Sequence, residues 1–284
     1  MRYGLLQDHH STQPRPALLY IPGLGGSVKI ALPFLQSLLP YFNPIYGVDL
    51  RGFGLNISDE PLQDVNHLLP DMEAFDEQVL APARQSGEFN AGLSLAAISL
   101  GGVVATLLAS RHPERYQELL LFAPAYAPHP TTFPASYLFS NLLNHIFKGR
   151  HARTRLPYDI SKVTRNPLIL ADPDFQSWLP RLTLTPGFLL SVRLLSLRAM
   201  LACRNITVPT CMFIPGADEV CDPATMLKAF HRIPRQTPKH VITYPNFYHD
   251  LLLEESHHIH TIVSDLLAWR GKRHPQEASL VEAR

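Results

Sequence analysis

Short apolar runs alternate with longer stretches of mixed polarity along the chain. The pattern predicts strands at residues 17–21, 45–49, 93–98, 118–122, 210–215 and 240–244. It predicts helices at residues 28–41, 68–86, 102–111, 223–232 and 256–269. Nearly continuous apolar strands that alternate with helices are typical of a mostly parallel sheet covered on both faces, so we expect an α/β fold. Residues 2–7 leave room for one further antiparallel strand at the edge of this sheet.

One interval between predicted strands is much longer than a connection requires. From Phe122 to Thr210 the chain runs 88 residues, whereas a crossover between parallel strands needs only about a dozen. Residues 126–205 contain ten Lys and Arg and three Asp, a net charge of +7, while the rest of the chain is net acidic. We therefore predict an inserted, basic, mainly helical cap at 126–205. It would lie on a core formed by 1–125 and 206–270, with a polar tail at 271–284.

Composition narrows the class of protein. Of 284 residues, 46% are hydrophobic and 17% charged, which allows a sizeable core and excludes global disorder. The formal net charge of +1 excludes a strongly basic nucleic-acid binder, and we expect no nucleic-acid partner. No apolar run approaches the roughly 20 residues of a membrane span, and the N-terminus lacks the apolar stretch of a secretory signal. We therefore expect a soluble, cytoplasmic protein.

The three cysteines add little to this picture. Cys203, Cys211 and Cys221 are too few and too unevenly spaced for a disulfide framework or a CxxC metal site. Cys221 comes three residues after a candidate acid described below, so it is expected near the functional site.

The segment from Leu95 to Ala105 carries the most informative motif. Its sequence is LAAISLGGVVA, an apolar strand that leads into Ser99, two glycines and a helix of small residues. This is the layout of a nucleophile elbow, in which small residues flank a serine because strand and helix approach closely. Ala97 stands where the usual G-x-S-x-G pattern has its first glycine. The backbone N–H of Leu100, at the start of the helix, would point toward developing negative charge.

A second serine fits the same degenerate pattern. Ser94 lies in the sequence GLSLA, but a loop precedes it and strand rather than helix follows it. Context therefore favours Ser99 as the nucleophile. An ordinary serine in a strand–turn–helix is the alternative interpretation.

A nucleophilic serine needs a base and an acid that orients the base, in the chain order Ser, Asp or Glu, His for this architecture. The strand at 210–215 is followed by GADEVCD, which offers Asp218, with Asp222 as a rival. The strand at 240–244 is followed by PNFYHD, which contains His249. Loops after neighbouring parallel strands meet at the edge where such sheets bind ligands, so we expect the serine, one acid and the histidine to meet there.

A glycine-rich loop follows the strand at 17–21. Residues 18–27 read LLYIPGLGGS, without a lysine at the Walker position and without G-x-G-x-x-G, which argues against a nucleotide site. An oxyanion donor, the backbone N–H of Leu24, suits this loop better.

Together these motifs resemble the α/β-hydrolases, and specifically the monoglyceride lipase and lysophospholipase branch with a helical cap. The matching pieces span about 17–255 apart from the cap, and are IPGLG at 21–25, VDLRGFG at 48–54, ISLGG at 98–102, PGADEVCD at 215–222 and YHD at 248–250. The sequence NPLILADP at 166–173 also resembles the end of that family's cap.

The resemblance implies roles for five residues: Ser99 as nucleophile, His249 as general base, Asp218 as orienting acid, and the N–H groups of Leu24 and Leu100 as oxyanion donors. It selects Asp218 over its rival because the family places the acid two residues after the glycine. The implied chemistry requires no metal and no organic cofactor.

Four other positions matter for the comparison with that family. The family usually has histidine where Pro22 and Ile98 stand, and both positions adjoin the expected site. Asp49 and Arg51 lie in a motif that is usually structural there, so we expect no catalytic role for them.

The resemblance implies a serine hydrolase that cleaves fatty acyl esters of the monoacylglycerol or lysophospholipid kind through an acyl-enzyme on Ser99. An acyltransferase stays open, because an alcohol or thiol can capture the same acyl-enzyme. A proline-iminopeptidase-like peptidase also stays open, although it needs cap acids and the cap has only three. A ligand receptor on the same fold would have lost a member of the triad, and all three candidates are present.

The cap carries an apolar stripe followed by basic residues. Its apolar side chains are Tyr137, Leu138, Phe139, Leu142, Leu143, Ile146 and Phe147, and the last five recur at helical spacings as one apolar stripe. We expect it on the inner face of the lid and a basic outer face that includes Lys148, Arg150, Arg153 and Arg155. Simple packing on the core and a solvated charged face are the alternatives to contact with an anionic lipid surface. The sequence does not predict an oligomeric state.

Overall fold

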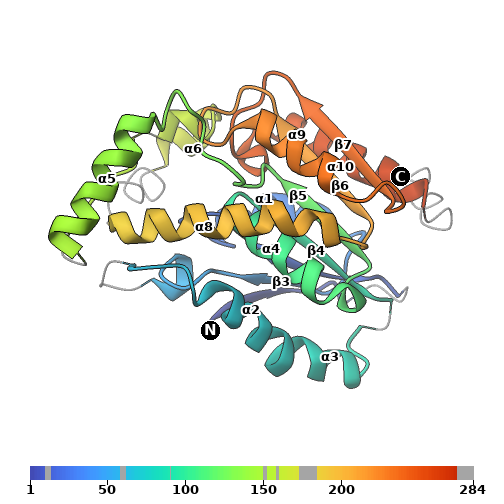
Figure 1. The fold of residues 1–284 in the computed structure, drawn as a ribbon. Helices are drawn as coiled ribbons and strands as arrows, with labels where there is room; N and C mark the ends of the chain where they lie inside the picture. Colours follow the sequence, from blue (N-terminus) through green and yellow to red (C-terminus); the bar gives the residue numbers. More distant parts are fainter. Residues whose placement is uncertain are drawn as a thin grey trace.

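A seven-stranded sheet lies at the centre of the computed structural model, which describes residues 1–9, 14–57, 62–89, 91–149, 152–157, 160–172 and 184–273 (Figure 1). The strands lie in the order β1-β3-β2-β4-β5-β6-β7. Their bounds are Tyr3–Leu6, Ala17–Ile21, Ile45–Val48, Leu93–Ile98, Glu118–Phe122, Thr210–Pro215 and Lys239–Tyr244 for β1 to β7. Only β1 runs antiparallel, beside β3, so the expected parallel sheet with one antiparallel edge strand is confirmed.

The central strands are apolar because both of their faces are covered. Every residue of β2, β3, β4, β5 and β6 is buried. Their register places Ile98 opposite Phe122, and Phe122 opposite Phe213. The carboxyl ends of these strands therefore meet at one edge of the sheet, where the loops that follow them can share a site.

Helices cover the sheet on both faces. The core around α1 (Leu32–Leu38) and α10 (Ser256–Gly271) lies on one face. The core around α2 (Leu68–Phe75), α4 (Leu100–Arg111), α8 (Pro186–Ala202) and α9 (Pro223–Arg232) lies on the other. Short single-turn helices lie at η1 (Gly54–Asn56), η3 (Pro113–Arg115), η5 (Ile160–Lys162), η6 (Cys203–Asn205) and η7 (Leu251–Leu253). The expected α/β fold is confirmed.

Two helices differ from the sequence expectation in their regularity. The stretch expected at 28–41 is helical only in α1, where Pro33 lies in the first turn. The stretch expected at 68–86 is continuous, but a π-helical turn, η2 (Asp76–Leu80), separates α2 from α3 (Ala81–Gln85). Pro82 follows this turn and has no N–H to donate to it, which explains the local change of hydrogen bonding.

In the described part of the long interval between β5 and β6 the structure has three α-helices. Helices α5 (Ala135–Lys148) and α6 (Pro167–Ala171) lie toward one end of the molecule, at the upper left of Figure 1. Helix α8 returns beneath them and packs against α4, α5 and α9. The last part of the predicted cap thus joins the helical layer over the sheet.

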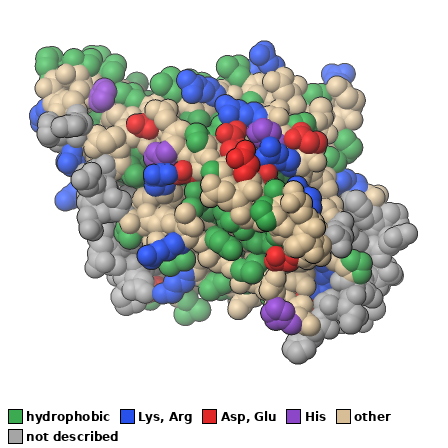
Figure 2. Space-filling model, turned by 90° about the horizontal axis from the view of Figure 1, so that it is seen from below, with side chains coloured by type: hydrophobic (Ala, Val, Ile, Leu, Met, Phe, Trp, Pro, Cys, Tyr) green, Lys and Arg blue, Asp and Glu red, His purple; other side chains and the backbone are tan. Residues whose placement is uncertain are grey.

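The apolar stripe on α5 does not face inward. Phe139 is 61% exposed, Ile146 63% and Phe147 80%, and Asn141 is the one residue of α5 that is fully buried. For the stripe the expectation of an inner face is therefore wrong, because spacing identifies a face but not the side to which it turns. Tyr137 and Leu138 of the same helix, in contrast, line the pocket described below. Hydrophobic side chains are visible at the upper left of Figure 2, at the end of the molecule where Figure 1 places α5.

The basic residues after α5 are also on the surface. Lys148, Arg153 and Arg155 are exposed, while Arg150 lies outside the described residues. On the face shown in Figure 2, basic and acidic side chains lie among one another rather than forming one uniformly basic surface.

Helix α8, extended by η6, is long and apolar enough to cross a membrane by length and composition. The expectation that no such segment exists was therefore wrong. The helix packs against α4, α5 and α9, and 33% of its most apolar 18-residue stretch is buried. Phe188, Leu195 and Ala199 are among its buried residues.

Candidate active site

Ser99 lies in the turn between β4 and α4, with φ +53° and ψ −120°. A positive φ is uncommon for a residue with a side chain and marks a strained turn. Two glycines allow this turn to pack closely. A Cβ atom on Gly101 would collide with the backbone oxygens of Ile21 and Pro22, and one on Gly23 would lie 2.8 Å from Cβ of Ser99. These contacts explain the small residues of the motif.

His249 follows β7 and connects the serine to an acid. Its Nε2 atom lies 2.9 Å from Oγ of Ser99, and its Nδ1 atom lies 2.7 Å from Oδ2 of Asp218. Both distances are within the range over which a proton can be shared. His249 is 6% exposed and Asp218 is 2% exposed, so bulk water does not compete for these hydrogen bonds. The structure thus brings the three expected residues together.

The loop after β6 fixes the carboxylate of Asp218. Its Oδ1 atom accepts hydrogen bonds from the backbone N–H groups of Val220 (2.7 Å) and Cys221 (2.8 Å), and Oδ2 remains for His249. An acceptor at Nδ1 favours the tautomer that is protonated there, so Nε2 can accept the proton of Ser99.

Two effects compete on the pKa of His249. Burial lowers the pKa, whereas the charge of Asp218, the hydrogen bond to it and the charge of Asp250 raise it. The net shift is upward, because the imidazolium form is stabilised by the carboxylates beside it.

The rival residues have other partners. The carboxylate of Asp222 accepts from the backbone N–H groups of Ala224 and Thr225 and caps the N-terminus of α9. Ser94 is fully buried in β4, where its hydroxyl donates to Glu118 (2.7 Å). Neither residue contacts His249, so the geometry favours Asp218 and Ser99.

A pocket opens above Ser99 and His249. Its walls are mostly apolar and come both from loops around the sheet and from the interval between β5 and β6, including Ile30, Phe133, Leu138, Leu156, Val163, Leu189, Val192 and Leu252. Leu24 and Leu100, the expected oxyanion donors, also line it, and so do Pro22 and Ile98. Such a pocket, apolar with a few converging polar groups, is the usual form of a small-molecule site.

Polar side chains to which the sequence assigned no role also line this pocket, among them Arg193, Ser196 and Asp250. Arg193 and Ser196 come from α8 and donate to the backbone oxygens of Tyr126 and Ala125. Asp250 directly follows His249, and burial raises its pKa to about 6. In the sequence, only the position of Asp250 next to His249 indicated that it lies in the site. Arg193 and Ser196 could not be assigned from the sequence, because they reach the pocket through the packing of α8.

The cysteines are free and buried. Cys221 lines the pocket, as its spacing from Asp218 led us to expect. Burial raises the pKa of its thiol, the charge of Asp218 acts in the same direction, and a hydrogen bond with Ser99 acts against them. The thiol is therefore neutral and behaves as a small apolar group.

Asp49 and Arg51 have the structural contacts that were expected of them. Asp49 is buried and accepts from the backbone N–H groups of Val28 (2.7 Å) and Leu55 (2.8 Å), which holds the glycine-rich loop to the turn after β3. Arg51 forms a surface ion pair with Asp71. Within the described part of the chain, no three His, Cys, Asp or Glu side chains lie together as a metal site would require.

Solved structures of similar fold come from several hydrolases. A soluble variant of monoglyceride lipase from Saccharomyces cerevisiae, in complex with a substrate analogue, aligns with a TM-score of 0.80 and 20% identity over 95% of this chain and 91% of the other. A monoacylglycerol lipase from Paleococcus ferrophilus aligns with 0.73 and 18% over 95% and 100%. An enol-lactonase from Burkholderia xenovorans aligns with 0.65 and 14% over 94% and 95%.

The family comparison covers most of the chain. The family model described as serine aminopeptidase, S33, matches residues 12–256 and thus includes Ser99, Asp218 and His249. The geometry of these residues, the sheet topology and this match agree with one another. The chain is an α/β-hydrolase-fold serine hydrolase and belongs to the serine aminopeptidase S33 family.

Proposed function

We propose that the protein is a serine esterase that cleaves fatty acyl esters, of the monoacylglycerol or lysophospholipid kind, through an acyl-enzyme on Ser99. One observation carries the proposal: the hydrogen-bonded series Ser99, His249 and Asp218 lies at the floor of a largely apolar pocket. Two monoglyceride lipases among the structures of similar fold support the choice of substrate class.

In the first half-reaction Oγ of Ser99 attacks the carbonyl carbon of the ester while Nε2 of His249 takes its proton. Asp218 accepts from Nδ1 and stabilises the imidazolium that forms. The carbonyl oxygen becomes an oxyanion, which the backbone N–H groups of Leu24 and Leu100 would stabilise. The imidazolium then protonates the leaving alcohol, and the acyl group stays on Ser99.

The second half-reaction reverses the roles of the same groups. His249 takes a proton from water, the resulting hydroxide attacks the acyl-enzyme, and the fatty acid leaves as Ser99 regains its proton. If an alcohol replaces water at this step, the product is a new ester. Hydrolysis and acyl transfer therefore differ only in the molecule that reaches the acyl-enzyme.

A substrate panel tests the proposal. Turnover of p-nitrophenyl esters of increasing chain length and of monoacylglycerols, lost in Ser99→Ala, is the expected result. Added alcohol should divert product to a new ester if acyl transfer competes. Absence of turnover by the wild-type protein, with tight binding of a lipid, would instead favour a ligand receptor.

Aminopeptidase activity is the second candidate, and Asp250 is the observation that favours it. Asp250 is the one carboxylate among the described residues that line the pocket, so it could hold a substrate ammonium group. On aminoacyl anilides, Asp250→Asn should then raise KM strongly. The ester proposal predicts negligible turnover of these anilides. It also predicts that esters are cleaved whether or not the substrate carries an ammonium group.

We also propose that α5 contacts anionic lipid surfaces. Its exposed apolar stripe adjoins three exposed basic residues, Lys148, Arg153 and Arg155. Apolar side chains can enter the interface while each basic residue near an anionic surface contributes about 1 kcal/mol.

Vesicle binding tests this contact. Reversal of Lys148, Arg153 and Arg155 to Glu should weaken binding to anionic vesicles, most at low salt, and leave hydrolysis of a soluble short-chain ester nearly unchanged. A matched control reverses three exposed basic residues on or after α9: Lys228, Arg232 and Arg235. Equal losses in both triple variants would contradict a specific role for α5.

A further inference from the structure

The cap and the loop that carries His249 are joined by a set of hydrogen bonds. The cap segment 163–166 lies between η5 and α6, and the histidine loop, which we define as residues 245–255, lies between β7 and α10. The bonds are Asp250 N to Val163 O (2.8 Å), Thr164 Oγ1 to Leu253 O (3.1 Å), and Asn166 Nδ2 to Leu253 O (3.1 Å) and Glu254 O (3.3 Å).

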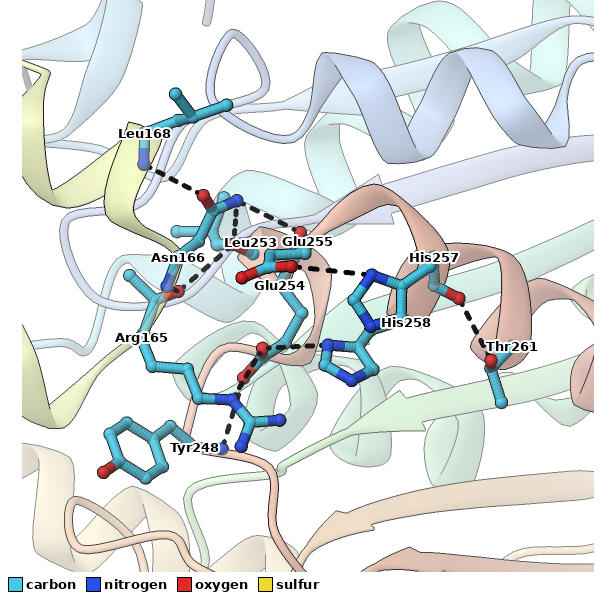
Figure 3. A network of polar contacts seen from close by, with 11 residues as sticks. Arg165, Asn166, Leu168, Tyr248, Leu253, Glu254, Glu255, His257, His258 and Thr261 are labelled. Carbon is cyan, nitrogen blue, oxygen red and sulfur yellow. Dashed lines mark hydrogen bonds and ion pairs between the residues drawn. The ribbon is translucent and has the colours of Figure 1, made fainter.

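A buried carboxylate lies at the centre of this contact (Figure 3). Glu254 is 1% exposed, and its Oε2 atom lies 3.2 Å from Nε of Arg165 and 3.5 Å from Nδ1 of His258. Its Oε1 atom accepts from the backbone N–H of Tyr248 at 3.4 Å. A buried charge is costly unless it is paired and hydrogen-bonded, so these partners determine where the carboxylate lies.

Arg165 joins the cap to the residues that precede His249. Its guanidinium carbon lies 5.3 Å from the ring centre of Phe247 and 5.9 Å from that of Tyr248, within the range of cation–π attraction. In Figure 3 the arginine extends from the cap segment toward Glu254, with Tyr248 below it. One side chain of the cap therefore contacts both the buried carboxylate and the two aromatic residues of the loop.

The backbone of His249 is thus fixed from both sides. The N–H of Tyr248, the preceding residue, bonds to Glu254, and the N–H of Asp250, the following residue, bonds to the cap at Val163. The imidazole itself bonds to Ser99 and Asp218 with two different nitrogens. A displacement of the loop would lengthen one of these two bonds, and a misplacement of 1 Å can cost about 100-fold in rate.

We propose that Arg165 and Glu254 are positioning residues that make the placement of His249 depend on the seated cap. The proposal rests on the proposed role of His249 as general base. It differs from a purely structural role, in which the same contacts would attach the cap and stabilise the fold without affecting proton transfer.

The test uses the full-length protein and a short-chain p-nitrophenyl ester. Arg165→Met keeps the packing stem and removes the charge, and we expect kcat to fall by about 10- to 100-fold with KM changed less than about twofold. Glu254→Gln keeps an oxygen for Tyr248 and should give a smaller loss of kcat. Arg165→Lys restores a positive charge and should recover part of the lost rate.

The pH profile separates positioning from stability. Asp218 raises the pKa of His249, so an imidazole moved away from it should lose part of that shift. The acid limb of kcat/KM in Arg165→Met should therefore move to lower pH. Ser191→Ala is the matched control, because it removes a different bond of the interval 126–205 to the core, from Val65 N to Ser191 Oγ, and should leave both kcat and the acid limb unchanged.

The outcomes are distinct. A folded Arg165→Met protein with wild-type kcat and an unmoved acid limb overturns the proposal, as does a lower kcat that Arg165→Lys does not recover. If Arg165→Met does not fold, kcat and the acid limb of Glu254→Gln are measured instead, and wild-type values of both would overturn the proposal. If His249→Ala is as active as the wild type, the proposed function fails first, and the positioning role falls with it.

Discussion

Oγ of Ser99 lies 2.9 Å from Nε2 of His249, although 150 residues separate them in the chain. Asp218, 31 residues before the histidine, lies 2.7 Å from its other ring nitrogen. These three side chains come from loops after β4, β6 and β7, and the parallel sheet brings these loops to one edge.

We expect a fluorophosphonate probe to label Ser99 and no other serine. Ser99→Ala should abolish labelling and lower kcat by about 10⁴- to 10⁶-fold, because the nucleophile is lost while the fold remains. Ser94→Ala is the control, since Ser94 is buried against Glu118. Labelling that persists in Ser99→Ala and disappears in Ser94→Ala would reverse the assignment.

Asp218→Asn should reduce kcat far more than Asp222→Asn. An amide at Asp218 can present an N–H to His249 and favour the wrong tautomer, which costs about 10⁴-fold in a comparable triad. Asp222→Asn should affect only the cap of α9, at about 1 kcal/mol of stability or less. Steady-state kinetics and chemical denaturation of both variants separate the two roles. Equal losses of kcat would leave the acid unassigned.

The rate of ester hydrolysis should rise with pH as His249 loses its proton. Because the pKa of His249 is raised, the midpoint of kcat/KM should lie above about 6.5, the ordinary value for histidine. The residual activity of Asp218→Asn should show a lower midpoint, because that carboxylate favours the protonated form. A midpoint in Asp218→Asn equal to that of the wild type would contradict this account.

Asp250 should make the protein less stable above about pH 6 than at pH 4. Its pKa in the folded state is about 6, above about 3.9 in the unfolded chain. Burial thus favours the neutral form, and its stabilising contribution is complete below pH 4 and lost as pH rises through 6. Asp250→Asn should therefore gain about 1–3 kcal/mol over the wild type at pH 8 and little at pH 4. Urea titrations at both pH values measure this, with Glu77→Gln at an exposed carboxylate as control.

The strands could be predicted from the sequence almost to the residue, because both faces of this sheet are covered. Continuous apolar runs such as 93–98 and 210–215 are short and bounded by loops, and this length favours a buried strand over a helix. Helix α8 was not predicted because its apolar residues do not form one stripe. Leu194 and Leu201 are exposed while Ser196 is buried, so the pattern shows no helical periodicity.

The residues of the candidate site also differ in whether the sequence could predict them. Ser99, Asp218 and His249 could be placed because each follows a strand of the parallel sheet. The orientation of α5 could not, since its apolar stripe is exposed against the usual preference. Arg165 and Glu254 are 89 residues apart, and nothing in either local sequence reports that the two side chains meet.

The long insertion leaves the sheet after β5 and returns to it at β6, and these strands are hydrogen-bonded neighbours with Phe122 opposite Phe213. An inserted segment of any length can therefore be accommodated without a change in sheet register. The part of the protein that meets the substrate can diverge in evolution while the reacting atoms stay where they are. Arg165 and Asn166 bond to the histidine loop, which limits this divergence. A different inserted segment would have to form its own hydrogen bonds to that loop.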